Sequence, residues 1–188
     1  MSFAARNVSV RIVACLVATV IVAVQAVAAP TVWSGPTISF SKAGGADHTL
    51  PANQDHLTPN VALARGNSQG MFNILQESGY TGASPADTEW ATAINNPGDV
   101  ITASNYSALD FTTWTAAYGN QTSVNILNYD AVVHLVTDDV YLDLRFTSFQ
   151  GGGGGGGFAY ERSTAVPEPA SLLAAAVFGL MLLPIRRR

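Results

Sequence analysis

The densest group of carboxylates in the chain is formed by Asp138, Asp139 and Asp143. A hard cation such as Ca²⁺ binds several oxygen ligands at about 2.3–2.6 Å, and neighbouring acids at a strand turn can supply some of them. The spacing is not that of an EF-hand, because no D-x-D-x-D-G series is present. Two interpretations stay open: a calcium site, or a solvated turn in which Asp143 faces Arg145 or Arg162 across neighbouring strands.

Histidines are the other candidates for acid–base or metal chemistry. His48 and His56 each follow an aspartate on one polar segment, and such pairs can bind a transition metal or exchange protons. However, the sequence has no H-E-x-x-H motif, no third ligand at a supporting spacing and no G-x-S-x-G nucleophile motif. His134 lies in an apolar stretch, where we expect a half-buried structural residue. The sequence therefore favours a non-enzymatic protein, with a secreted hydrolase as a weaker alternative.

Aromatic side chains are numerous enough to stack on sugar rings, provided that several of them share one exposed face. If they instead fill the core of a β domain, they carry no binding function. A carbohydrate-binding module therefore remains an alternative beside a calcium-binding one. The aromatic residues in question are Trp33, Trp90, Tyr106, Trp114, Tyr118 and Tyr141.

The N-terminal 28 residues have the layout of a secretory signal peptide. Arg6 and Arg11 give a positive start, and the apolar stretch from Ile12 to Val24 is followed by small residues. Ala26 and Ala28 form an A-x-A site, so we expect signal peptidase to cut after Ala28. The apolar run is too short for a stable membrane span.

The C-terminal segment combines a proline-flanked acid, an apolar run and a basic end. The proline rings keep the start of the segment extended and short of backbone donors. The run from Leu172 to Ile185 favours a helix that is short for a hydrocarbon core of about 30 Å, so it spans only with thinning or snorkelling. The terminal arginines hold that end on the cytoplasmic side. The residues are Val166, Pro167, Glu168 and Pro169 at the start and Arg186, Arg187 and Arg188 at the end.

This tail resembles the PEP-CTERM sorting signal of exported bacterial proteins. The resemblance implies recognition by an exosortase, a membrane enzyme that cuts near the Pro-Glu-Pro motif and releases or re-anchors the protein. It also implies an inner-membrane-anchored precursor that later reaches the cell surface or the medium, with exopolysaccharide as a candidate partner. A plain C-terminal membrane anchor is the alternative.

Between the two terminal segments, residues 29–165 form a body of the size of one domain. It carries four basic and twelve acidic residues, a net charge of −8, whereas the whole chain carries −4. An acidic body repels phosphate backbones, so nucleic acid and anionic membrane surfaces are poor candidates as partners. The only cysteine, Cys15, lies in the signal peptide, so the body has neither a disulfide nor a thiolate site.

Strand patterns dominate the body. The segment Val140–Phe146 alternates apolar and polar residues and predicts a strand with one buried face, paired as a hairpin with Asp130–Val136. Val61–Ala64 and Met71–Leu75 predict a second hairpin. Phe158–Ser163 predicts a last strand.

The remaining segments are less regular. Trp33–Phe40 predicts an edge strand broken by a turn, and residues 41–60 predict a loop. Ser84 followed by Pro85 and two acids predicts the start of one short helix, stopped before Pro97. Ser104–Tyr118 predicts a strand pair, and the seven glycines from Gly151 to Gly157 predict a flexible hairpin loop.

Together these patterns predict an all-β, sandwich-like antiparallel domain with one short helix, between a signal-peptide helix and a short transmembrane helix. The body also resembles an uncharacterised exported domain of bacterial surface proteins, a resemblance that implies one domain and no activity. The leading hypothesis is a non-enzymatic component of the cell surface or extracellular matrix. The segments that carry the resemblance are Trp33–Pro36, Arg65–Ser68, Ser84–Ala91, His134–Ser148 and the glycine-rich run that leads into Phe158–Thr164.

Overall fold

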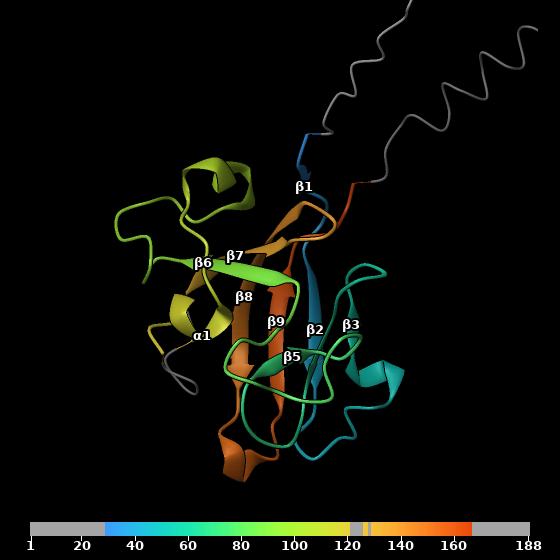
Figure 1. Cartoon of the computed structure of the whole chain (residues 1–188). Coiled ribbons are helices and arrows are strands. Elements are labelled where there is room, and N and C mark those ends of the chain that lie inside the picture. Colours follow the sequence, from blue (N-terminus) through green and yellow to red (C-terminus); the bar gives the residue numbers. More distant parts are fainter. Residues whose placement is uncertain (1–28, 121–125, 128, 167–188) are drawn as a thin grey trace, which may run out of the picture.

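The computed structural model describes residues 29–120, 126–127 and 129–166, which form two β-sheets and a few short helices (Figure 1). The predictions for the signal peptide, for Pro167–Pro169 and for the C-terminal run with its arginines fall outside these residues. The elements are β1 (Thr31–Trp33), β2 (Ile38–Lys42), η1 (Pro51–Asn53), β3 (Asp55–His56), β4 (Ala62–Arg65), β5 (Met71–Asn73), β6 (Thr88–Thr92), η2 (Ala103–Ala108), α1 (Trp114–Ala117), β7 (Asp130–Leu135), β8 (Val140–Phe149), η3 (Gly152–Gly154) and β9 (Phe158–Arg162).

The larger sheet has six strands in the order β2-β9-β8-β7-β6, with β1 placed beside the start of β8. All pairs are antiparallel except β1 with β8, which run parallel with Thr31 opposite Val140. The smaller sheet is antiparallel, in the order β3-β4-β5. The prediction of a mostly β body is confirmed, as are the two hairpins and the last strand.

The main core lies on one face of the six-stranded sheet. Because side chains alternate along a strand, Leu142, Leu144 and Phe146 of β8 all point into this core and are buried. Leu63 and Met71 of the smaller sheet belong to the same cluster. Burial of apolar surface between the two sheets therefore holds them together, at about 25 cal/mol per Å².

A buried ion pair also links the two sheets. The guanidinium of Arg162, in β9, donates two hydrogen bonds to the carboxylate of Asp55, in β3, at 2.7 and 2.9 Å. The hydroxyl of Tyr160 donates to the same carboxylate at 2.7 Å. Burial alone would lower the pKa of Arg162, but the hydrogen bonds and the charge of Asp55 outweigh it and raise that pKa.

The glycine run connects β8 to β9, as predicted, but its last part is packed rather than free. Gly155 and Gly156 have φ values of 68° and 69°, and Gly45 donates to the carbonyl of Gly155 at 2.8 Å. A Cβ atom on Gly156 would lie 2.0 Å from the carbonyl oxygen of Gly66. Backbone from three distant segments therefore meets here because none of them carries a side chain.

Arg65, at the end of β4, stabilises the packing around the glycine run through hydrogen bonds. Its guanidinium donates to the carbonyls of Gln69, Gln150 and Gly157 at 2.7–2.9 Å and lies 3.6 Å from the ring centre of Phe149. Burial lowers the pKa of Arg65 to about 10, so it stays protonated at neutral pH. Its charge is satisfied by carbonyl dipoles and an aromatic face.

The helix predicted at Ser84 is wrong. After the Ser84–Pro85 peptide bond, which is cis, the chain turns and enters β6, where Trp90 is fully buried and pairs with Val133. Asp87, expected in the first helical turn, has a φ of 61° and accepts hydrogen bonds from Thr137. Pairing with β7 therefore overrides a local capping signal.

The strand pair predicted for Ser104–Tyr118 is also wrong. This stretch forms η2 and α1, and the one bridge it makes joins Thr112 to Trp90. Trp114 and Tyr118 lie one helical turn apart and both enter the main core. The loop predicted for residues 41–60 is confirmed, except that this stretch also contains the end of β2 and the short elements η1 and β3.

Both ends of the described body lie at one pole of the molecule (Figure 1). Gly35 donates to the carbonyl of Thr164 at 2.8 Å, and the Thr164 hydroxyl donates to the carbonyl of Pro36 at 2.8 Å. The glycine connection lies at the opposite pole (Figure 1). Within the part of the chain that the structure describes, no helix is both long and apolar enough to cross a bilayer.

Candidate functional site

The polar residues predicted on β8 lie on the face of the large sheet that points away from the main core. Tyr141, Asp143 and Arg145 follow one another along this outer face, next to His134 and Asp130 of β7. The segment between β6 and β7, which carries η2, folds over one end of the face. The outer face is therefore divided into a covered aromatic part and an open polar part.

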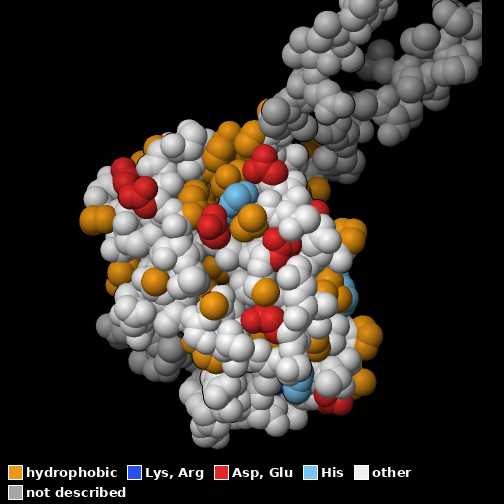
Figure 2. All heavy atoms as spheres, viewed as in Figure 1, with side chains coloured by type: hydrophobic (Ala, Val, Ile, Leu, Met, Phe, Trp, Pro, Cys, Tyr) orange, Lys and Arg blue, Asp and Glu red, His pale blue; other side chains and the backbone are white. Residues whose placement is uncertain are grey.

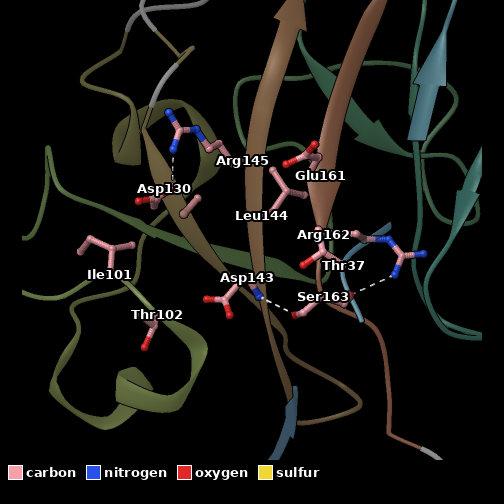
Figure 3. Close-up of a pocket in the computed structure, with 11 residues that line it drawn as sticks. Thr37, Ile101, Thr102, Asp130, Asp143, Leu144, Arg145, Glu161, Arg162 and Ser163 are labelled. Atoms are coloured by element: carbon pink, nitrogen blue, oxygen red, sulfur yellow. Dashed lines mark hydrogen bonds and ion pairs between the residues drawn. The ribbon is translucent and has the colours of Figure 1, made fainter. Parts of the chain in front are cut away.

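The open part contains a pocket of about 290 Å³ (Figure 3). Its walls come from strands β7, β8 and β9 and from the segment that leads into η2. Its lining is made of three acids, two arginines, three residues with hydroxyl groups and three apolar residues. The lining residues are Thr37, Ile101, Thr102, Asp130, Ala131, Asp143, Leu144, Arg145, Glu161, Arg162 and Ser163.

Asp143 is the most enclosed acid of this pocket. Its Oδ1 accepts a hydrogen bond from the backbone N–H of Ala103 at 2.7 Å, and its own N–H donates to the Ser163 hydroxyl at 3.0 Å. Burial raises the pKa of the Asp143 carboxyl, the Ala103 bond opposes this rise, and the charge of Asp130 adds to it. Asp143 is therefore a carboxylate whose negative charge is only partly compensated.

The arginines do not supply that compensation. The guanidinium of Arg162 points away from Asp143 (Figure 3), towards Asp55 on the other side of the sheet. Arg145 pairs with Asp130 at 3.4 Å instead. The expectation that Asp143 faces Arg145 or Arg162 as an ion pair is thus wrong, because each arginine has another acid as its partner.

The three acids of the predicted calcium site are held apart by separate partners. Asp138 accepts hydrogen bonds from Thr58 at 2.6 Å and from Asn60 at 2.9 Å, and so fastens the loop before β4. Asp139 lies 3.3 Å from a ring nitrogen of His134, and Asp143 lies in the pocket. Among the described residues no group of three acidic, histidine or cysteine side chains is arranged to hold a metal ion. Calcium binding itself stays a prediction.

His134 is the centre of the covered aromatic part. Its ring stacks on Tyr141 at 4.2 Å, and Tyr106 of η2 stacks with the same tyrosine at 4.2 Å. Each ring nitrogen of His134 lies 3.3 Å from a carboxylate, one of Glu89 and one of Asp139. With a side chain 14% exposed, His134 is the half-buried residue that the sequence predicts. Figure 2 shows a histidine side chain on the visible surface with acidic and hydrophobic side chains around it.

The remaining aromatic residues do not share this face. Trp90, Trp114 and Tyr118 are buried in the main core, while Trp33 is half-buried on the inner side beneath Arg162. A row of exposed rings on one sheet, the arrangement that would favour sugar stacking, is therefore not formed by these residues. Neither His48 nor His56 lines the pocket.

No family model, curated protein or solved structure matches this chain. Function must therefore be argued from its own residues. Of the sorting motif, Val166 is described and exposed, whereas the Pro-Glu-Pro residues are not among the described ones.

Part of the pocket could be found in the sequence and part could not. Strand alternation places Asp143 and Arg145 on the outer face of β8, and the same rule places Glu161 on the outer face of β9. Ile101 and Thr102 come from an irregular segment about 40 residues earlier, which no periodic pattern assigns to this face. Only the three-dimensional structure brings them to Asp143.

Proposed function

We propose that this chain is a non-enzymatic, exported component of the bacterial cell surface or extracellular matrix, built from a sandwich-like β domain and processed by an exosortase. The proposal rests first on the tail, where Val166 to Pro169 precede an apolar run and a basic end. Signal peptidase would remove the N-terminal segment, and the inner membrane would hold the precursor until the tail is cut. The processed domain would then be released or re-anchored.

The structural observation that supports this proposal is the shared pole of the two chain ends. Because Gly35 and Thr164 are hydrogen-bonded, the segments that lead to the signal peptide and to the sorting motif leave the domain side by side. In the membrane-bound precursor, a domain with this layout would be attached at one pole, and its other surfaces would face away from the membrane. Val166, the first residue of the sorting motif, has an exposed side chain next to the folded domain.

Intact mass spectrometry of the protein from membranes and from medium tests the proposal, in cells with and without the exosortase. We expect a species that ends near Pro167–Pro169 only when the enzyme is present. Replacing Pro167, Glu168 and Pro169 together by alanine should leave the tail in place even with the enzyme.

Pro97→Ala, at an exposed loop proline of the body, is the matched control and should be processed normally. A product that keeps Arg186–Arg188 in both strains would show that the tail is a simple anchor, and the proposed sorting would be wrong.

A further inference from the structure

The pocket on the outer face has an unbalanced charge that indicates its ligand. Two of its three acids, Asp143 and Glu161, have no ion-pair partner among the described residues. Arg145 pairs with Asp130 in an exposed and therefore weak contact, and the charge of Arg162 is neutralised by Asp55. A ligand that enters the pocket therefore meets a net negative field, which attracts cations and repels phosphate, sulfate and carboxylate groups.

Hydrogen-bonding capacity in the pocket is also left unused. The side chain of Asp143 employs Oδ1 for the Ala103 N–H, so that its second oxygen is free to accept. Ser163 is only 6% exposed, and its oxygen accepts from the Asp143 N–H, yet its hydroxyl proton has no acceptor among the described residues. A ligand atom that accepts this proton would therefore gain a hydrogen bond in the pocket.

The shape of the pocket limits the size of this ligand. A volume of about 290 Å³ lies just below the usual range for small-molecule sites, about 300–1,000 Å³, so the pocket suits a small unit such as a single sugar residue. Thr37 and Thr102 add hydroxyl groups near the rim, and Ile101 adds an apolar wall. Such a mixture of acids, hydroxyls and apolar side chains matches a ligand that is rich in hydrogen-bond donors and also presents apolar C–H surface, as a sugar does.

We propose that this pocket binds a sugar residue that carries a protonated amine, within a longer cationic glycan. Asp143 and Glu161 accept hydrogen bonds from the ammonium group, and the Ser163 hydroxyl donates to a ring or hydroxyl oxygen. The choice of a glycan over another amine rests on the proposed location in the extracellular matrix, whereas the charge preference rests on the pocket alone.

Isothermal titration calorimetry on the folded protein tests this at about pH 6, which lies well above the pKa of a free carboxylic acid. The probes are a fully deacetylated glucosamine oligomer, its N-acetylated counterpart of equal length, and an oligogalacturonate. We expect the deacetylated oligomer to bind at least about tenfold more tightly than the neutral one, with an affinity that falls as salt is added. The oligogalacturonate should not bind.

The double variant Asp143→Asn, Glu161→Gln assigns the binding to the pocket. It should lower the affinity for the deacetylated oligomer at least about tenfold. Asp47→Asn, Asp110→Asn removes the same charge from exposed positions outside the pocket and should leave the affinity unchanged. Thermal unfolding of both variants checks that each is folded.

Several results would overturn the inference. Equal binding of the deacetylated and acetylated oligomers would remove the role of the amine, and unchanged binding by the pocket variant would place the site elsewhere. Oligolysine that binds as well as the glucosamine oligomer would identify a peptide amine instead of a sugar. None of these results depends on tail processing, so failure here and failure of the proposed sorting are distinguishable.

Discussion

At the scale of single residues, two Asp–Arg ion pairs of this protein differ in burial and therefore in their expected contribution to stability. The Asp55–Arg162 pair is buried, with both side chains about 8% exposed, whereas the Asp130–Arg145 pair is 62% and 48% exposed. Exposed pairs are screened by water and contribute about 0–1 kcal/mol. Removing one partner of a buried pair instead leaves an uncompensated charge in the interior, which costs about 3–5 kcal/mol.

Asp55→Asn should therefore lower the free energy of unfolding by about 3–5 kcal/mol, because Arg162 then stays buried without a counter-charge. Asp130→Asn, the matched control, should change it by less than about 1 kcal/mol. Urea unfolding followed by tryptophan fluorescence measures both. If Asp55→Asn costs no more than Asp130→Asn, the buried pair does not hold the two sheets together.

At the scale of elements, the glycine connection illustrates a contact that depends on missing side chains. Gly156 combines a left-handed backbone with the close approach of the Gly66 carbonyl, whereas a Cβ on Gly153, in the same run, would meet no atom within 4 Å. Gly153 and Gly156 therefore differ sharply in whether they tolerate a side chain. The residue type is the same, so the difference is set by the backbone conformation at each position and by what packs against it.

We expect Gly156→Ala to lower the free energy of unfolding by at least about 2 kcal/mol, because it adds left-handed strain to a steric clash. Gly153→Ala should change it by no more than about 0.5 kcal/mol. Thermal and urea unfolding of the two variants make the comparison. Similar small effects at both positions would mean that the whole run is a loose loop.

The sequence was most informative where a pattern is local and repeated. The alternation in β8 and the turn at Thr137–Asp139 are sufficient to predict the β7–β8 hairpin and its buried face. The signal at Ser84 and Pro85 is equally local but misleading, because Trp90 gains more from burial beside β7 than a short helix gains from its cap.

Long-range contacts explain the rest of what sequence reasoning missed. Gly45 and Gly66 precede the glycine run by about 85–110 residues, so the sequence indicates a flexible loop and gives no sign of the contact that orders it. The pocket also depends on a long-range contact that the sequence does not indicate, since Ala103 and Asp143 are 40 residues apart. Residues that face outward can be assigned from alternation, but the segment that covers them cannot.

At the scale of the whole molecule, the position of the two ends determines which surfaces can meet a partner. The pole that carries Gly35 and Thr164 is the pole from which the tail departs, and the glycine connection lies at the other (Figure 1). Val136 is exposed in the turn between β7 and β8. This turn lies near the first pole, because the backbone N–H of Thr31 donates to the carbonyl of Asp139 in the same turn. In a tail-anchored precursor, these two poles must differ in their access to large reagents.

Single-cysteine variants measure this difference. The body has no cysteine, and Cys15 lies in the segment that we expect to be removed, so Gly153→Cys and Val136→Cys each introduce one reactive thiol. Only five residues separate Val166 from the apolar run at Leu172, a reach of at most about 20 Å. In spheroplasts without exosortase, we therefore expect a bulky polyethylene glycol maleimide to modify Gly153→Cys at least about threefold faster than Val136→Cys. Rates in detergent correct for intrinsic reactivity, and if the corrected rates are equal, this pole is not held at the membrane.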